Sequence, residues 1–196
     1  MKTDIILSGV GGQGIVTIAA IIGTAALKNN IYIKQSEVHG MSQRGGAVQS
    51  HLRISEKPID SDLIPFGHAD LILSVEPLES LRYLPYLSFK GCLVTNSNPF
   101  INIPDYPDLQ LILDEIKILK NYFYLDADAL AREIKSPRSS NVLMLGAASS
   151  YIFLGEELLR EGIREVFKNK DEEVINQNLT AFDTGKKYVE NQKIQV

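Results

Sequence analysis

Short apolar runs alternate with longer amphipathic stretches along most of the chain. Ile5–Leu7 and Leu71–Val75 are continuous apolar runs, as expected for strands buried on both faces of a parallel sheet. Ala47–Ile54 alternates apolar with polar residues, which is typical of a half-exposed strand. The same patterns predict further strands at Ile31–Lys34, Gly91–Asn96 and Tyr122–Leu125.

Helical periodicity separates these strands. Ile15–Lys28 has apolar residues on nearly every side, so this helix is expected to pack between the sheet and another element. Asp126 is a suitable N-cap for the helix that follows it, and small residues at 146–150 suit close packing. Further helices are predicted at Leu78–Leu87, Ala127–Ile134, Asn141–Leu154, Glu156–Lys168 and Glu172–Asn191.

Two polar segments have no clear period and are predicted to be connections. Ser36–Gly46 is expected to be a long ordered loop, and Asn98–Asp108 contains three prolines. Strands that alternate with helices indicate an α/β fold. We therefore expect one domain over residues 1–196, a three-layer Rossmann-like fold whose mostly parallel sheet is flanked by helices.

Size, charge and the N-terminal residues limit the classes of function. The 196 residues suffice for one core, and 44% hydrophobic and 22% charged residues are ordinary for a globular protein. A net charge of -4 argues against a nucleic-acid partner. Because the sequence contains neither a signal-peptide pattern nor a long apolar segment, we expect a cytoplasmic protein without a membrane partner.

The supply of metal ligands is small. Cys92 is the single cysteine, so an intrachain disulfide is impossible and a reducing compartment is favoured. One thiolate is too few for an iron–sulfur cluster, which normally needs four. The three histidines, His39, His51 and His68, lack metal-ligand spacing. We therefore expect no metal and no redox cofactor on this chain.

The first candidate site is a glycine-rich turn. Gly9, Gly11 and Gly14 satisfy the pattern G-x-G-x-x-G between a predicted strand and a predicted helix. The free N–H groups of a first helical turn favour an anion by about 0.3–1 kcal/mol. A dinucleotide would also need an acid at the end of the second strand, and Glu37 is a poor match. Three interpretations of this turn stay open: it binds a nucleotide, it contacts a partner subunit or another ligand, or its glycines only allow tight packing.

The second candidate site is the segment Ser-Glu-Val-His-Gly-Met-Ser-Gln-Arg-Gly-Gly from residue 36 to residue 46. Arg44 could bind a carboxylate or phosphate with its guanidinium, and His39 could transfer a proton near neutral pH. A solvated surface loop is the alternative, and no catalytic residue can be assigned. The candidate ligand- or partner-binding residues are Gly9, Gly11, Gly12, Gln13, Gly14, Ser36, Glu37, His39, Gly40, Met41, Ser42, Gln43, Arg44 and Gly45.

Taken together, these two segments carry a family resemblance. They resemble the beta subunit of indolepyruvate ferredoxin oxidoreductase and, more broadly, the gamma subunit or domain of the 2-oxoacid:ferredoxin oxidoreductases. The resemblance extends from residue 4 to about residue 190, with weaker similarity at Glu76-Pro77, Asp126-Ala127 and Asn141 before Leu145-Gly146-Ala147.

The resemblance implies a division of labour between subunits. In that family thiamine diphosphate decarboxylates a 2-oxoacid, iron–sulfur clusters reduce ferredoxin, and coenzyme A takes the acyl group. A large partner subunit would hold the thiamine diphosphate and the clusters. This chain would form the interface and part of a coenzyme A or substrate channel, with both glycine segments at the sheet edge that meets the partner. The alternatives are a free-standing nucleotide-binding Rossmann dehydrogenase and a non-catalytic scaffold.

Overall fold

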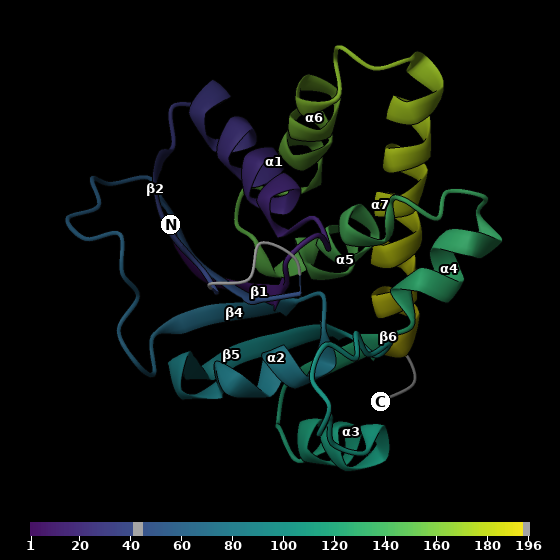
Figure 1. Ribbon diagram of the computed structural model, residues 1–196. Coiled ribbons are helices and arrows are strands. Elements are labelled where there is room, and N and C mark those ends of the chain that lie inside the picture. Colours follow the sequence, from purple (N-terminus) through teal and green to yellow (C-terminus); the bar gives the residue numbers. More distant parts are fainter. Residues whose placement is uncertain (41–44, 194–196) are drawn as a thin grey trace.

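Six strands form one sheet in the computed structural model, which describes residues 1–40 and 45–193 (Figure 1). The sheet order is β2-β3-β1-β4-β5-β6. β1, β4, β5 and β6 run parallel, whereas β3 is antiparallel to both of its neighbours, β1 and β2. The strands are β1 (Lys2–Val10), β2 (Tyr32–His39), β3 (Ala47–Ser55), β4 (Ala69–Ser74), β5 (Leu87–Asn96) and β6 (Tyr122–Leu125).

Successive strand residues supply two separate cores, because side chains alternate between the faces of a sheet. Ile5 and Leu7 face a large core that they share with α1, α5, α6 and α7. Ile6 faces a smaller core with Ile112 and Ile116 of α3. The sheet therefore lies between two helical layers (Figure 1), which confirms the predicted three-layer, mostly parallel α/β fold.

Seven α-helices surround the sheet within the described residues. They are α1 (Ile15–Lys28), α2 (Pro77–Arg82), α3 (Leu109–Lys117), α4 (Ala127–Glu133), α5 (Ser140–Ala148), α6 (Glu156–Val166) and α7 (Glu172–Lys193), with short 3-10 turns at Leu84–Tyr86 and Ser149–Tyr151. α5 and α7 approach so closely that a Cβ on Gly146 would lie 1.9 Å from the carbonyl oxygen of Phe182. The small residues after 145 thus allow the close packing that the sequence predicted.

Three of the predicted elements differ from the sequence expectations. Ser36–His39 continue β2 and pair with residues 48–51 of β3, so a loop over the whole of Ser36–Gly46 is wrong. An edge strand tolerates polar side chains on both faces, which concealed it. The helix expected over Leu78–Leu87 ends at Arg82, because Pro85 has no N–H to continue it. The helix expected over Asn141–Leu154 ends at Ala148, where a 3-10 turn follows.

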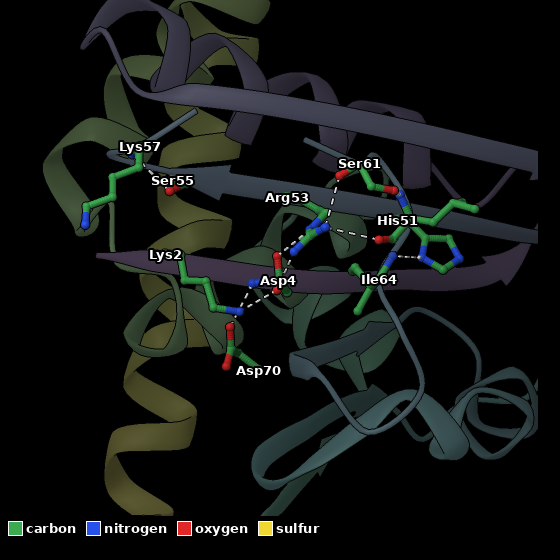
Figure 2. A network of polar contacts seen from close by, with 10 residues as sticks. Lys2, Asp4, His51, Arg53, Ser55, Lys57, Ser61, Ile64 and Asp70 are labelled. Atoms are coloured by element: carbon green, nitrogen blue, oxygen red, sulfur yellow. Dashed lines mark hydrogen bonds and ion pairs between the residues drawn. The ribbon is translucent and has the colours of Figure 1, made fainter. Parts of the chain in front are cut away.

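A polar network fixes the end of the sheet where β1 begins (Figure 2). Arg53 of β3 lies directly opposite Asp4 of β1 and donates two hydrogen bonds to its carboxylate, of 2.8 and 3.1 Å. The same guanidinium donates to the carbonyl oxygens of Ser61 and Leu63 at 3.0 and 3.1 Å. Nδ1 of His51 accepts a hydrogen bond of 3.0 Å from the N–H of Ile64. These contacts hold the β3–β4 connection against the sheet.

Candidate functional site

A cleft of about 510 Å³ opens at the carboxyl ends of β1, β4 and β5. It is lined by the glycine turn at the start of α1, by the residues that follow β5, and by the residues that lead into α5. Val75 and Asp128 complete the walls. This is the edge at which open α/β sheets bind ligands, and it is the opposite edge from the Asp4–Arg53 network.

The glycine turn has a fixed geometry in this cleft. Gly14 precedes α1 with φ of 84°, in the left-handed region that favours glycine. A Cβ there would also lie 2.4 Å from Nδ2 of Asn141, which donates to the carbonyl oxygen of Gly14 at 3.2 Å. Oε1 of Gln13 accepts from the N–H of Val10 at 2.7 Å, and Nε2 donates to the carbonyl oxygen of Val75 at 3.3 Å. Gln13 therefore ties the end of β1 to the residue that follows β4 and contributes to the cleft lining.

One wall of the cleft combines the N-termini of two helices with an arginine side chain. α1 and α5 both begin at this wall, and neither helix start receives a side-chain capping hydrogen bond within the described residues. Arg138 lies two residues before α5 and lines the same wall. Helix N-termini and a guanidinium all favour a negatively charged group. This wall can bind a phosphate or carboxylate.

The connection 97–108 also contributes to the cleft lining and is anchored at two points by a buried carboxylate. Glu76, two residues after the end of β4, is 1% exposed. Oε1 of Glu76 accepts from the N–H of Phe100 at 3.3 Å and from the Tyr106 hydroxyl. Oε2 accepts from the N–H of Glu79 at 2.8 Å and so caps α2. Burial and the hydrogen bond to Glu76 raise the pKa of Tyr106, which therefore stays a neutral donor.

The second sequence motif meets the first through its last glycines. The N–H of Gly11 donates to the carbonyl oxygen of Gly46 at 2.9 Å. Nδ2 of Asn102 donates to the carbonyl oxygen of Gly45 at 2.7 Å. The two glycine segments thus share one edge of the sheet, as the sequence predicted.

The two motifs contribute unequally to the cleft. Gly12, Gln13 and Gly14 line it. Ser36, Glu37 and His39 lie on β2, two strands away from β1, and are not among the lining residues. Nε2 of His39 contacts Oε1 of Glu37 on the same strand. The candidates Met41, Ser42, Gln43 and Arg44 lie outside the described residues.

Several lining residues were missed by sequence reasoning. Asn96 ends β5 and Asn98 follows it, Asp128 is in the first turn of α4, and Arg138 was placed only in a break between helices. Polar residues directly after a strand were a usable signal, because parallel strands bring their carboxyl ends to one edge. Nothing local in the sequence indicated that Arg138 would reach the same cleft.

The comparisons with known proteins agree with this architecture. Residues 4–188 match the family model described as pyruvate ferredoxin/flavodoxin oxidoreductase. The chain belongs to this family. It is 36% identical over 193 residues to indolepyruvate oxidoreductase subunit IorB of Pyrococcus horikoshii, a match that covers 94% of each chain.

Solved structures share the fold of this family member. A chain of the 2-oxoglutarate:ferredoxin oxidoreductase from Magnetococcus marinus, with 2-oxoglutarate, coenzyme A and succinyl-CoA bound, gives a TM-score of 0.76 at 23% identity, covering 97% of this chain and 31% of that one. Pyruvate oxidoreductase subunit PORC of Thermotoga maritima gives 0.70 at 21% identity, covering 95% and 96%. The family's α/β fold is therefore present over nearly the whole chain.

The sheet order argues against the Rossmann dehydrogenase alternative. In a dinucleotide-binding fold the acid ends the second strand, which follows the glycine turn in sequence and lies parallel beside the first strand. Here antiparallel β3 separates β1 from β2, and Glu37 lies on β2. In this family member Glu37 is therefore not in the place that a dinucleotide-binding acid requires.

Over residues 1–40 and 45–193, no group of three or more His, Cys, Asp or Glu side chains is arranged to hold a metal ion. Among the same residues, no helix combines the length and apolarity that crossing a membrane requires.

Proposed function

We propose that this chain is the small subunit of an indolepyruvate-type 2-oxoacid:ferredoxin oxidoreductase of the cytoplasm. Its large partner subunit would hold thiamine diphosphate and the iron–sulfur clusters and would pass electrons to ferredoxin. Support comes from the relative in Pyrococcus horikoshii, which is named for indolepyruvate, and from the single cysteine Cys92, which is buried. One thiolate cannot hold a cluster, so the redox centres belong on the partner.

The cleft would hold coenzyme A, whose thiol takes the acyl group. The observation that carries this proposal is the donor-rich wall, where Arg138 and the starts of α1 and α5 lie together. Such a wall suits the phosphates of the coenzyme, because guanidinium groups and helix N-termini bind phosphate. In that role this chain binds and orients the coenzyme. Gly12 and Gly14 would let the protein backbone approach the coenzyme closely.

The two glycine segments, Gly9–Gly14 and Ser36–Gly46, would face the large subunit. They share the sheet edge that carries the cleft. Since the acyl group forms on the partner, the mouth of the cleft has to open toward that subunit. Residues at this edge that bind the coenzyme would then lie at the interface between this chain and the large subunit.

The test measures the coenzyme dependence of the assembled enzyme. This chain is co-expressed anaerobically with its large subunit, and ferredoxin reduction by indolepyruvate is followed as coenzyme A is varied. Arg138→Ala should raise KM for coenzyme A about ten-fold or more, because a charge-assisted phosphate contact is lost. Arg132→Ala is the matched control, since Arg132 is an exposed guanidinium on α4 that does not line the cleft.

Two results would contradict the proposal. Equal KM values for wild type and Arg138→Ala would remove coenzyme A from this wall of the cleft. Failure of the chain to co-purify with an iron-containing thiamine enzyme would remove the subunit assignment itself.

A further inference from the structure

We propose that Asp128 is a specificity-determining residue of the cleft: its carboxylate accepts a hydrogen bond from an uncharged N–H or O–H group of the coenzyme. This inference deepens the proposed function and rests on it. It assigns the cleft two chemically different ends, a donor end at Arg138 for phosphate and an acceptor end at Asp128 for a neutral donor.

The carboxylate of Asp128 is held by two amides. Asp128 lies in the first turn of α4, is half-buried and lines the cleft. Its Oδ2 accepts from Nδ2 of Asn96 at 2.9 Å and from Nδ2 of Asn98 at 3.0 Å. Asn96 ends β5 and Asn98 follows it, so two side chains from one end of the sheet fix this carboxylate.

The side-chain amide of Asn96 can contact Asp128 in only one orientation, with its nitrogen toward the carboxylate. Its side chain is almost completely buried. Its Oδ1 accepts from the N–H of Asn98 at 3.2 Å and from the N–H of Ala127 at 3.0 Å. Since two backbone donors occupy the oxygen, the amide nitrogen has to face Asp128. The acceptor is therefore fixed in place before any ligand arrives, which reduces the cost of binding.

The second oxygen of Asp128 is available to a ligand. Oδ1 accepts no hydrogen bond and contacts no cation among the residues that the structure describes. A carboxylate can accept about four hydrogen bonds. Bridging Asn96 and Asn98 explains the position of Oδ2, but it does not require a carboxylate in a ligand cleft, where an amide oxygen could do the same.

Charge then decides which part of the ligand lies at each end. A phosphate beside Asp128 would be repelled, and the repulsion is strong where walls of low dielectric shield the pair from water. An N–H or O–H donor would instead gain a charge-assisted hydrogen bond. Coenzyme A offers such donors on both sides of its pyrophosphate: the adenine amine and ribose hydroxyl on one side, and the pantetheine amides on the other.

The test compares ligands in the assembled complex of Asp128→Asn, which removes the charge with little change of shape. KM for coenzyme A should rise at least about ten-fold, by more than kcat falls. Inhibition by inorganic pyrophosphate should stay as strong as in wild type or become stronger, because the like charge is gone. Asp60→Asn removes the same charge from an exposed position on the β3–β4 connection, at the opposite edge of the sheet, and should change neither.

Fragments of coenzyme A identify which part of it donates the hydrogen bond to Asp128. Thermal denaturation checks that Asp128→Asn keeps the fold. If the donor is on the nucleotide part of coenzyme A, Asp128→Asn should weaken inhibition by adenosine 3′,5′-bisphosphate. If the donor is on the pantetheine part, the same substitution should weaken inhibition by pantetheine. An unchanged KM for coenzyme A, or equal losses for coenzyme A and pyrophosphate, would overturn the inference. Failure of the proposed function gives a different result, because Arg138→Ala would then also leave KM for coenzyme A unchanged.

Discussion

Replacing Asp4 by alanine should be among the most destabilising single changes outside the apolar cores. The Asp4 side chain is 3% exposed and that of Arg53 is 19% exposed, and two hydrogen bonds of 2.8 and 3.1 Å join them. Alanine would leave the guanidinium without its counter-charge. Removing one partner of a buried ion pair costs about 3–5 kcal/mol. Because Arg53 keeps some contact with water, we expect the lower end, about 3 kcal/mol.

The assay is reversible denaturation in urea, with a thermal scan beside it. A loss of about 3 kcal/mol should lower Tm by about 6–12 °C in a chain of this size. Lys2→Ala is the matched control: Nζ of Lys2 lies 2.6 Å from the same carboxylate, but its side chain is 54% exposed. An exposed partner of this kind contributes about 1 kcal/mol or less. A loss below about 1 kcal/mol for Asp4→Ala would refute the reasoning.

The same pair predicts a pH dependence. Burial would raise the pKa of Asp4, but the hydrogen bonds from Arg53 and Lys2 outweigh it, so the pKa lies below its ordinary value of 3.8. Because the folded-state pKa is the lower one, the stabilisation is complete above the unfolded value and is lost as pH falls through the folded-state value. The stability difference between wild type and Asp4→Ala should therefore be constant near neutral pH and shrink below about pH 4.

Two further substitutions test the helix packing and the cleft wall. Gly146→Ala should lower the free energy of unfolding, measured in urea, by about 3 kcal/mol, because its Cβ would lie 1.9 Å from the backbone of α7. Gly23→Ala is the control and should be nearly neutral, because its Cβ meets only the end of the Ile33 side chain at 3.2 Å. Tyr106→Phe should lower the free energy of unfolding by about 1–3 kcal/mol, because the Glu76 carboxylate loses a hydrogen-bond donor. Tyr122→Phe is the control and should cost almost nothing, because the Tyr122 hydroxyl has no hydrogen bond among the described residues. Equal losses for the two variants would contradict this prediction.

The sequence predicted the elements whose patterns are local. Ile15–Lys28 and Tyr122–Leu125 have the predicted bounds, because a helix start after glycine and a short apolar run are both visible within a few residues. α3 was missed behind a proline-rich segment, although Asp108 caps it and Ile112 and Ile116 form its buried face. Its core contacts come from β1, β4 and β5, and no window of the sequence contains them together.

The candidate site was predictable only in part for the same reason. The glycine turn is a local motif, and it does lie in the cleft. Asn96, Asp128 and Arg138 reach the cleft because of the order of the parallel strands. That order depends on which strands pair, and antiparallel β3 between β1 and β2 could not be inferred from alternation alone. The position of Glu37, two strands from the glycine turn, follows from that unpredicted pairing.

The crossing of α5 and α7 has a consequence for how the chain is made. Phe182 of α7 is completely buried, and the backbones of the two helices meet at Gly146 and Gly185. A nascent chain that has been translated only as far as α6 has every strand of the sheet but lacks the helix that packs most closely on α5. Its largest core then stays open to water and to chaperones. Native packing of the larger core is therefore complete only after α7 has left the ribosome.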